Sequence, residues 1–160
     1  MSDAGEQRSD AGRIALHWVD PDAADPAYRG ERDLRWRVLR EPLGMPPGSE
    51  ENGAEERCLH LVAVASERVV GCVIFRVDPG ATGQLMQMAV EPALQGQGIG
   101  RLLVAELERQ LTATGVAEVT LHARQVAVGF YERLGYAVVG DPFTEVSIPH
   151  RSMRKVLVLH

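Results

Sequence analysis

A cluster of glycines in the middle of the chain is the segment most suited to chemistry. The seven residues from Gln95 to Arg101 (QGQGIGR) follow an apolar run typical of a strand and open an amphipathic helix. The first N–H groups of a helix have no partner inside the helix, and glycines let an anion approach them closely. The segment therefore predicts a phosphate-binding turn, although glycines in a turn can also serve the geometry of the chain alone.

The spacing of these glycines argues against two common nucleotide-binding sites. A dinucleotide fingerprint has a third glycine at the position of Arg101 and an acidic residue at the position of His122. A Walker loop ends in Gly-Lys-Ser or Gly-Lys-Thr, whereas Gly100 is followed by arginine. We therefore expect neither NAD binding nor nucleotide hydrolysis, and a general nucleotide-binding module is the weakest alternative.

The composition is that of an ordinary globular protein of 160 residues, with 45% hydrophobic residues and a formal net charge of -5. The sequence has no basic patch of the kind found in nucleic-acid-binding proteins and no apolar stretch long enough to cross a membrane. Its first residues are polar and unlike a secretion signal. Cys58 and Cys72 lack the spacing of a zinc site or a disulfide framework. We therefore expect a cytoplasmic protein with no metal, no nucleic-acid partner and no membrane association.

An alternation of strands and helices must position the glycine cluster. Small, polar residues predict a disordered tail over 1–12, and the stretch 41–57, rich in Pro, Gly and Glu, predicts a long loop. The strand-helix-strand passage over 84–122 requires two parallel strands, so residues 13–160 are predicted to form a single α/β (α+β) domain with a mixed sheet. The apolar patterns predict helices over 31–40, 98–114 and 125–134, and strands over 13–19, 59–66, 69–77, 84–90, 116–122, 136–140 and 153–159.

The pattern Gln-x-x-Gly-x-Gly, formed by Gln95, Gly98 and Gly100, resembles the GNAT superfamily of N-acetyltransferases. The resemblance covers about residues 59–160, because other tracts of the family occur in the same order. These tracts are Met88-Ala89-Val90 before the glycines and Phe130-Tyr131-Glu132-Arg133-Leu134-Gly135-Tyr136 after them. The ending Glu145-Val146-Ser147-Ile148-Pro149-His150, with Met153, resembles the ElaA-like branch.

The resemblance implies a GNAT-like fold, which is a mixed, mostly antiparallel central sheet with helices on both faces. One parallel pair of strands in that fold splays apart to bind acetyl-CoA, whose pantetheine arm adds to the strand that ends at Val90. Amides of the glycine cluster would bind the pyrophosphate. Arg124 departs from the family, which has Asn or Gln there, but a cation can also reach a phosphate. The residues implied in cofactor binding are Met88, Ala89, Val90, Gln95, Gly96, Gln97, Gly98, Ile99, Gly100, Arg101 and Arg124.

The activity implied by the resemblance is transfer of the acetyl group of acetyl-CoA to a primary amine of a small molecule or peptide. Tyr131 matches the tyrosine of the family, whose phenol can protonate the departing thiolate. No motif singles out the general base. His60, His122, Glu145, His150 or water could accept the proton of the amine.

The acceptor site is expected to be built from residues 31–57 and the C-terminal hairpin. Glu50, Glu51, Glu55 and Glu56 are expected to form a solvated acidic loop there, with attraction of a cationic amine as the alternative. The expected partners are acetyl-CoA and an amine acceptor, and the resemblance is compatible with a homodimer. A CoA-binding sensor or interaction module without transferase activity is the alternative function, because no base is evident.

Overall fold

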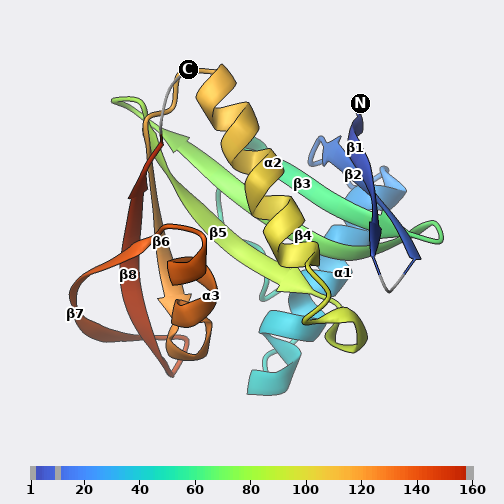
Figure 1. Cartoon of the computed structure of the whole chain (residues 1–160). Helices are drawn as coiled ribbons and strands as arrows, with labels where there is room; N and C mark the ends of the chain where they lie inside the picture. The colour runs from blue at the N-terminus through green and yellow to red at the C-terminus, as the bar shows by residue number, and fades with distance from the viewer. Residues whose placement is uncertain (1–2, 10–11, 158–160) are drawn as a thin grey trace.

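The computed structural model describes residues 3–9 and 12–157, and its central feature is a twisted sheet with helices on both faces (Figure 1). The eight strands run in the order β1-β2-β3-β4-β5-β6-β8-β7. The strands are β1 (Asp3–Ser9), β2 (Gly12–Val19), β3 (Cys58–Ala65), β4 (Arg68–Asp78), β5 (Thr82–Val90), β6 (Glu118–Arg124), β7 (Ala137–Glu145) and β8 (Ile148–Val156). The helices are α1 (Pro26–Leu39), α2 (Ile99–Ala113) and α3 (Val128–Arg133), with short 3-10 segments η1 (Glu41–Leu43), η2 (Glu55–Arg57), η3 (Pro92–Leu94) and η4 (Gln125–Ala127).

The predicted fold class is confirmed, because the sheet is mixed and mostly antiparallel. β5 and β6 are its parallel pair, as the strand-helix-strand passage requires. α1 packs on one face around Leu34, and α2 and α3 pack on the other, where Leu103 and Tyr131 join the larger apolar core. No helix in the described part of the chain is long and apolar enough to cross a membrane.

The expectation of a disordered tail is wrong for residues 3–9, which form β1. This strand pairs antiparallel with β2, so that Glu6 lies opposite Ala15. An edge strand forms through backbone hydrogen bonds to a single neighbour, and it therefore needs no apolar run in the sequence. Residues 1, 2, 10 and 11 lie outside the described residues.

Several predicted boundaries shift, and two of the shifts affect the site. α1 begins at Pro26 and not at residue 31, because the Asp25 carboxylate caps it by accepting from the Ala27 N–H at 2.9 Å. β7 and β8 form a longer hairpin than predicted, with its turn at Val146 and Ser147. The hairpin brings the C-terminal motif back toward the end of β6.

A β-bulge separates β5 from β6 beyond the point where their pairing ends. The two strands pair from Thr82 to Leu85 on β5 and then diverge. Cys72 pairs with Ala89 whereas Ile74 pairs with Met86, so β5 contains one extra residue. Gln87 lies in this bulge with a positive φ of 45°. The extra residue turns β5 and leaves its far half without a partner strand on the β6 side.

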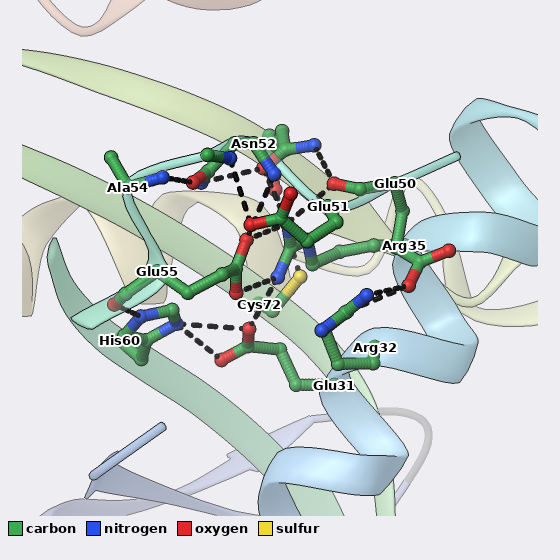
Figure 2. Close-up of polar contacts among 12 residues, drawn as sticks. Glu31, Arg32, Arg35, Glu50, Glu51, Asn52, Ala54, Glu55, His60 and Cys72 are labelled. Carbon is green, nitrogen blue, oxygen red and sulfur yellow. Dashed lines mark hydrogen bonds and ion pairs between the residues drawn. The ribbon is translucent and has the colours of Figure 1, made fainter. Parts of the chain in front are cut away.

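A buried ion network holds this bulge to α1 and to the loop before β3 (Figure 2). Arg35 has no exposed surface. Its guanidinium donates to the Glu31 carboxylate at 2.9 Å and to both oxygens of Glu55 at 2.8 and 2.7 Å. It also donates to the side-chain oxygen of Gln87 at 2.6 Å and to the Glu50 carbonyl at 2.7 Å. The network therefore positions the loop and the bulge together.

His60 supplies the second positive charge of this network. Its Nδ1 lies 2.9 Å from the Glu31 carboxylate and its Nε2 lies 2.7 Å from the Glu55 carbonyl oxygen. Both neighbours are acceptors, so both ring nitrogens donate and the ring is an imidazolium. Burial opposes this charge, but the hydrogen bonds to Glu31 and to the Glu55 carbonyl, together with the negative charges of both glutamates, outweigh burial and raise the pKa of His60. Two cations thus balance the carboxylates of Glu31 and Glu55.

The expectation of a solvated acidic loop is wrong for two of its four glutamates. Glu50 and Glu55 are buried, and they pair with Arg32 and Arg35 of α1. Glu51 and Glu56 are exposed. The arginines of α1 lie far from these glutamates in the sequence, so local composition does not reveal the pairs.

Acidification is expected to destabilise the protein through Glu55. Burial alone would raise the pKa of Glu55, but hydrogen bonds from Arg35 and Tyr28 lower it from 4.5 to about 2. A carboxylate with a depressed pKa in the folded state stabilises that state above its unfolded value, and the stabilisation is lost as pH falls through the folded value. The free energy of unfolding should therefore fall steeply between about pH 4.5 and pH 2.

Urea unfolding at a series of pH values measures this dependence. Glu55→Gln should flatten the curve in that pH window, whereas Glu51→Gln, at an exposed position of the same loop, should keep the wild-type slope. Parallel curves for the wild type and Glu55→Gln would show that Glu55 contributes nothing to acid sensitivity.

Candidate active site

A cavity of about 870 Å³ lies beside the glycine cluster, where α2 begins and β5 ends. Ten of the eleven residues predicted to bind the cofactor line it, and Arg124 is the exception. The lining residues are Val38, Leu39, Met88, Ala89, Val90, Leu94, Gln95, Gly96, Gln97, Gly98, Ile99, Gly100, Arg101, Val126, Ala127, Phe130, Arg133 and Leu134. We call this space the glycine-loop cavity.

The backbone of the glycine cluster explains why glycines occupy it. Gly96 and Gly98 have φ values of 82° and 91°, a left-handed conformation that other residues adopt only with strain. Gly98 is the N-cap of α2 and supplies no capping side chain, so the first amides of the helix depend on another acceptor. The Gln95 side chain donates to the Val90 carbonyl at 3.1 Å and ties the loop to the end of β5.

The charge and polarity of the glycine-loop cavity suit an anionic ligand with an apolar portion. Arg101 and Arg133 are its charged lining residues, and both are exposed to solvent. The side-chain oxygen of Gln97 is buried and has no hydrogen-bond partner among the described residues. Val126 presents an apolar side chain that is 94% exposed. These features fit a phosphate-containing cofactor with an extended apolar arm.

A second cavity of about 180 Å³ lies between the diverging ends of β5 and β6. Its lining residues are Leu39, Arg40, Leu85, Gln87, Met88, Leu121, His122, Ala123, Arg124, Ala127, Phe130, Tyr131, Glu145, Val146 and His150. It shares Leu39, Met88, Ala127 and Phe130 with the glycine-loop cavity. We call this space the inner cavity, and the shared residues form the boundary between the two.

Tyr131 lines the inner cavity from α3. Its ring packs edge-on against Phe130 and Tyr136, with centroid distances of 4.9 and 5.7 Å. No hydrogen bond of its hydroxyl to another described residue is present, and burial raises its pKa. The phenol therefore keeps its proton at neutral pH and has a donor available.

Three of the four candidate bases meet at the inner cavity. His122 Nδ1 lies 3.0 Å from one oxygen of Glu145, and His150 Nε2 lies 3.7 Å from the other. His150 Nδ1 lies 2.9 Å from the Ile148 carbonyl oxygen. When His122 Nδ1 donates to Glu145, the neutral His122 ring has its lone pair on Nε2, whereas both ring nitrogens of His150 face acceptors. The long hairpin of β7 and β8 is what brings Glu145 and His150 to His122.

His60, the fourth candidate base, does not reach this site. It lines neither of the two cavities, and both its ring nitrogens donate within the buried network. An imidazolium in this arrangement has no lone pair with which to accept a proton.

The side chains of Glu31, Glu55 and His60 have ligand atoms close enough together to hold a metal ion. In the structure, however, Arg35 donates to both carboxylates and lies among them. The negative charge that would attract a cation is already balanced, and we assign the cluster a structural role.

Two arginines meet in the inner cavity, and the sequence named only one of them as a site residue, although the other lies in the segment 31–57 that was expected to help build the acceptor site. Arg124 was implied in cofactor binding, but the structure places it in the inner cavity and not in the glycine-loop cavity. Arg40, the C-cap of α1, also lines the inner cavity. No motif marks Arg40, and only the packing of α1 against β5 brings it to the site.

Comparisons with known proteins agree with this geometry. The family model described as the acetyltransferase (GNAT) domain matches residues 47–157. A protein of Bacillus subtilis strain 168, named as an acetyltransferase, is 31% identical over 126 residues, which cover 77% of this chain and 85% of the relative.

Solved structures show the same fold. The crystal structure of Escherichia coli ElaA matches with a TM-score of 0.78 and 18% identity, and the match covers 89% of this chain and 99% of ElaA. An aminoglycoside 6'-N-acetyltransferase complexed with coenzyme A matches with a TM-score of 0.69 and 21% identity over 90% of this chain and 98% of that one. From the family match and its relatives, the chain belongs to the GNAT superfamily of acetyltransferases, which use acetyl-CoA.

Proposed function

We propose that the protein transfers the acetyl group of acetyl-CoA to a primary amine of a small molecule or peptide, with Tyr131 as the general acid. The observation that supports this most directly is the contact between the two cavities. The glycine-loop cavity fits a phosphate-containing cofactor, and it meets the inner cavity at Met88 and Phe130. Donor and acceptor could therefore approach each other at this boundary, beside Tyr131.

Acetyl-CoA supplies the acetyl thioester, whose C–S bond is exchanged for a C–N bond to the amine. The glycine loop and the start of α2 would hold its phosphates, with Arg101 and Arg133 adding positive charge. The unpaired half of β5 offers backbone groups to the pantetheine arm.

The reaction also requires two proton movements. The amine attacks in its neutral form and loses a proton as the C–N bond forms. We assign this proton to His122, whose Nε2 lone pair faces no described partner and whose Nδ1 is oriented by Glu145. Tyr131 gives its proton to the thiolate that leaves, and exchange with solvent restores the phenol.

Acetyl-CoA binding is expected to depend on the backbone conformation of the glycine loop. Gly98→Glu places a side chain and a negative charge at the start of α2, and it should weaken acetyl-CoA binding by about a hundred-fold or more. Calorimetry measures the affinity for acetyl-CoA. ATP and NAD serve as comparison ligands and should bind the wild type far more weakly than acetyl-CoA does. Gly115→Glu is the matched control, because Gly115 has a similar φ of 89° and lines neither cavity.

Equal binding of ATP, NAD and acetyl-CoA would favour a general nucleotide-binding module. Failure of the wild type to bind any of them would show that the glycine loop is only structural.

Removal of the Tyr131 hydroxyl is expected to slow transfer without affecting cofactor binding. Tyr131→Phe should lower turnover about ten-fold or more and leave the acetyl-CoA affinity unchanged, because the hydroxyl acts only on the departing thiolate. Thiol release with a panel of amines measures turnover. Tyr136→Phe is the control, since its hydroxyl donates to Glu108 at 2.8 Å and lines neither cavity.

Unchanged turnover in Tyr131→Phe would remove this residue from the acid role. Acetyl-CoA binding without thiol release for any amine would instead favour the CoA-binding sensor or interaction module.

A further inference from the structure

Two guanidinium groups converge on one carbonyl oxygen in the inner cavity. Arg124 Nη2 donates to the Leu39 carbonyl at 2.9 Å, and Arg40 Nη1 donates to the same oxygen at 3.2 Å. The two nitrogens therefore lie no further apart than the sum of these distances. Arg124 comes from the end of β6 and Arg40 from the end of α1, so the tertiary structure alone places these like charges together.

These two arginines differ from Arg32, Arg35 and Arg37 of α1, which all pair with carboxylates. Arg32 pairs with Glu50, Arg35 with Glu31 and Glu55, and Arg37 with Glu91. Among the described residues, Arg40 and Arg124 form no ion pair, and each uses its guanidinium only on the Leu39 carbonyl. A guanidinium has five N–H donors, so most donors of both groups remain available.

The environment of the pair disfavours its charge. Burial lowers the pKa of Arg40, and the charge of Arg35 lowers it further. Burial also lowers the pKa of Arg124, and the charge of Arg40 adds to that effect. Both groups are nevertheless charged at neutral pH, because arginine does not lose its proton in proteins. An anion between them would relieve the repulsion.

Glu145 offsets the positive charge of the pair only in part. Its charge raises the pKa of both arginines against the lowering effect of burial, but it forms no ion pair with either of them among the described residues. Glu145 is the acidic residue that lines the inner cavity, and it is oriented toward His122 and His150. The arginine pair thus lies beside the group that Glu145 forms with the two histidines, since Arg124 is opposite His150 in the pairing of β6 with β8.

We propose that Arg40 and Arg124 form an anion-binding subsite, and that the acceptor is an amine that also carries a carboxylate or a phosphate group. The inference rests on the proposed acetyltransferase function and narrows its substrate class. Binding of the anion at the arginine pair leaves the amine end free to face His122 and Tyr131. Bidentate contact with planar guanidinium groups would fix the orientation of such a substrate.

Matched probes test the subsite. The anionic probes are glycine, β-alanine and γ-aminobutyrate, together with the corresponding aminoalkylphosphonates, and the neutral probes are the amides of the three amino acids. Thiol release should give kcat/KM values about ten-fold or more higher for anionic probes than for the amides, since charge-assisted hydrogen bonds contribute on this scale. Comparison of the kcat/KM values for the carboxylates with those for the phosphonates then shows which of the two anionic groups the subsite prefers.

Arg40→Gln and Arg124→Gln should abolish the preference for anionic probes, so that the ratio of kcat/KM for an anionic probe to kcat/KM for its amide falls about ten-fold or more. A merely structural role would lower both rates together and keep their ratio, so the ratio distinguishes the subsite from an effect on folding. Arg68→Gln, at an exposed arginine that lines neither cavity, should behave as the wild type.

Calorimetry with CoA-saturated protein separates the failure of this inference from the failure of the proposed function. Binding of anionic probes that is lost in both variants supports the subsite even if no amine is acetylated. Acetylation of amides or diamines in preference to anionic amines would overturn the subsite and leave the transferase function standing. Absence of anion binding to the wild type, or binding unchanged in both variants, would also overturn it.

Discussion

A guanidinium with no contact with solvent must be surrounded by acceptors, and much of this structure is arranged to provide them for Arg35. An unpaired charge in the interior costs several kcal/mol, so α1, the loop before β3 and the bulge of β5 must converge on one point. Glu31 and Glu55 supply the negative charge, and His60 balances what remains. Because the same guanidinium holds Gln87, the network also fixes where β5 turns away from β6.

The turn of β5 away from β6 opens the space in which the site lies. While β5 and β6 are paired, side chains of α2 and the sheet fill the space beside them, but beyond Leu85 the two strands separate and leave room for ligands. The glycine loop lies on one side of the opening and the hairpin of β7 and β8 on the other. Met88 and Phe130 line both cavities and so belong to the boundary between them, next to the place where β5 leaves β6.

The arginines along α1 and at its C-terminal cap have different roles. Arg35 stabilises the fold through buried ion pairs, and Arg37 ties the helix to Glu91 at the end of β5. Arg40, just past the last turn, has no carboxylate partner among the described residues and shares the Leu39 carbonyl with Arg124. Other arginines of this region form ion pairs with carboxylates, whereas Arg40 and Arg124 form none among the described residues. The two lie where a substrate would bind under the proposed function. The binding energy of an anion is thereby available to orient that substrate.

The sequence by itself determined the mixed sheet and the helix after the glycine cluster, because apolar periodicity and turn glycines are local properties of the chain. The family followed from the resemblance of its motifs, which are also read along the chain. That resemblance also pointed to ten of the eighteen residues that line the glycine-loop cavity, since these ten lie close together in sequence, between Met88 and Arg101. Only the tertiary structure decided that Glu55 is buried, that His60 is an imidazolium away from the cavities, and that Arg40 meets Arg124. These facts depend on contacts between segments distant in the chain, and charge pairing across such distances leaves no pattern in the local sequence.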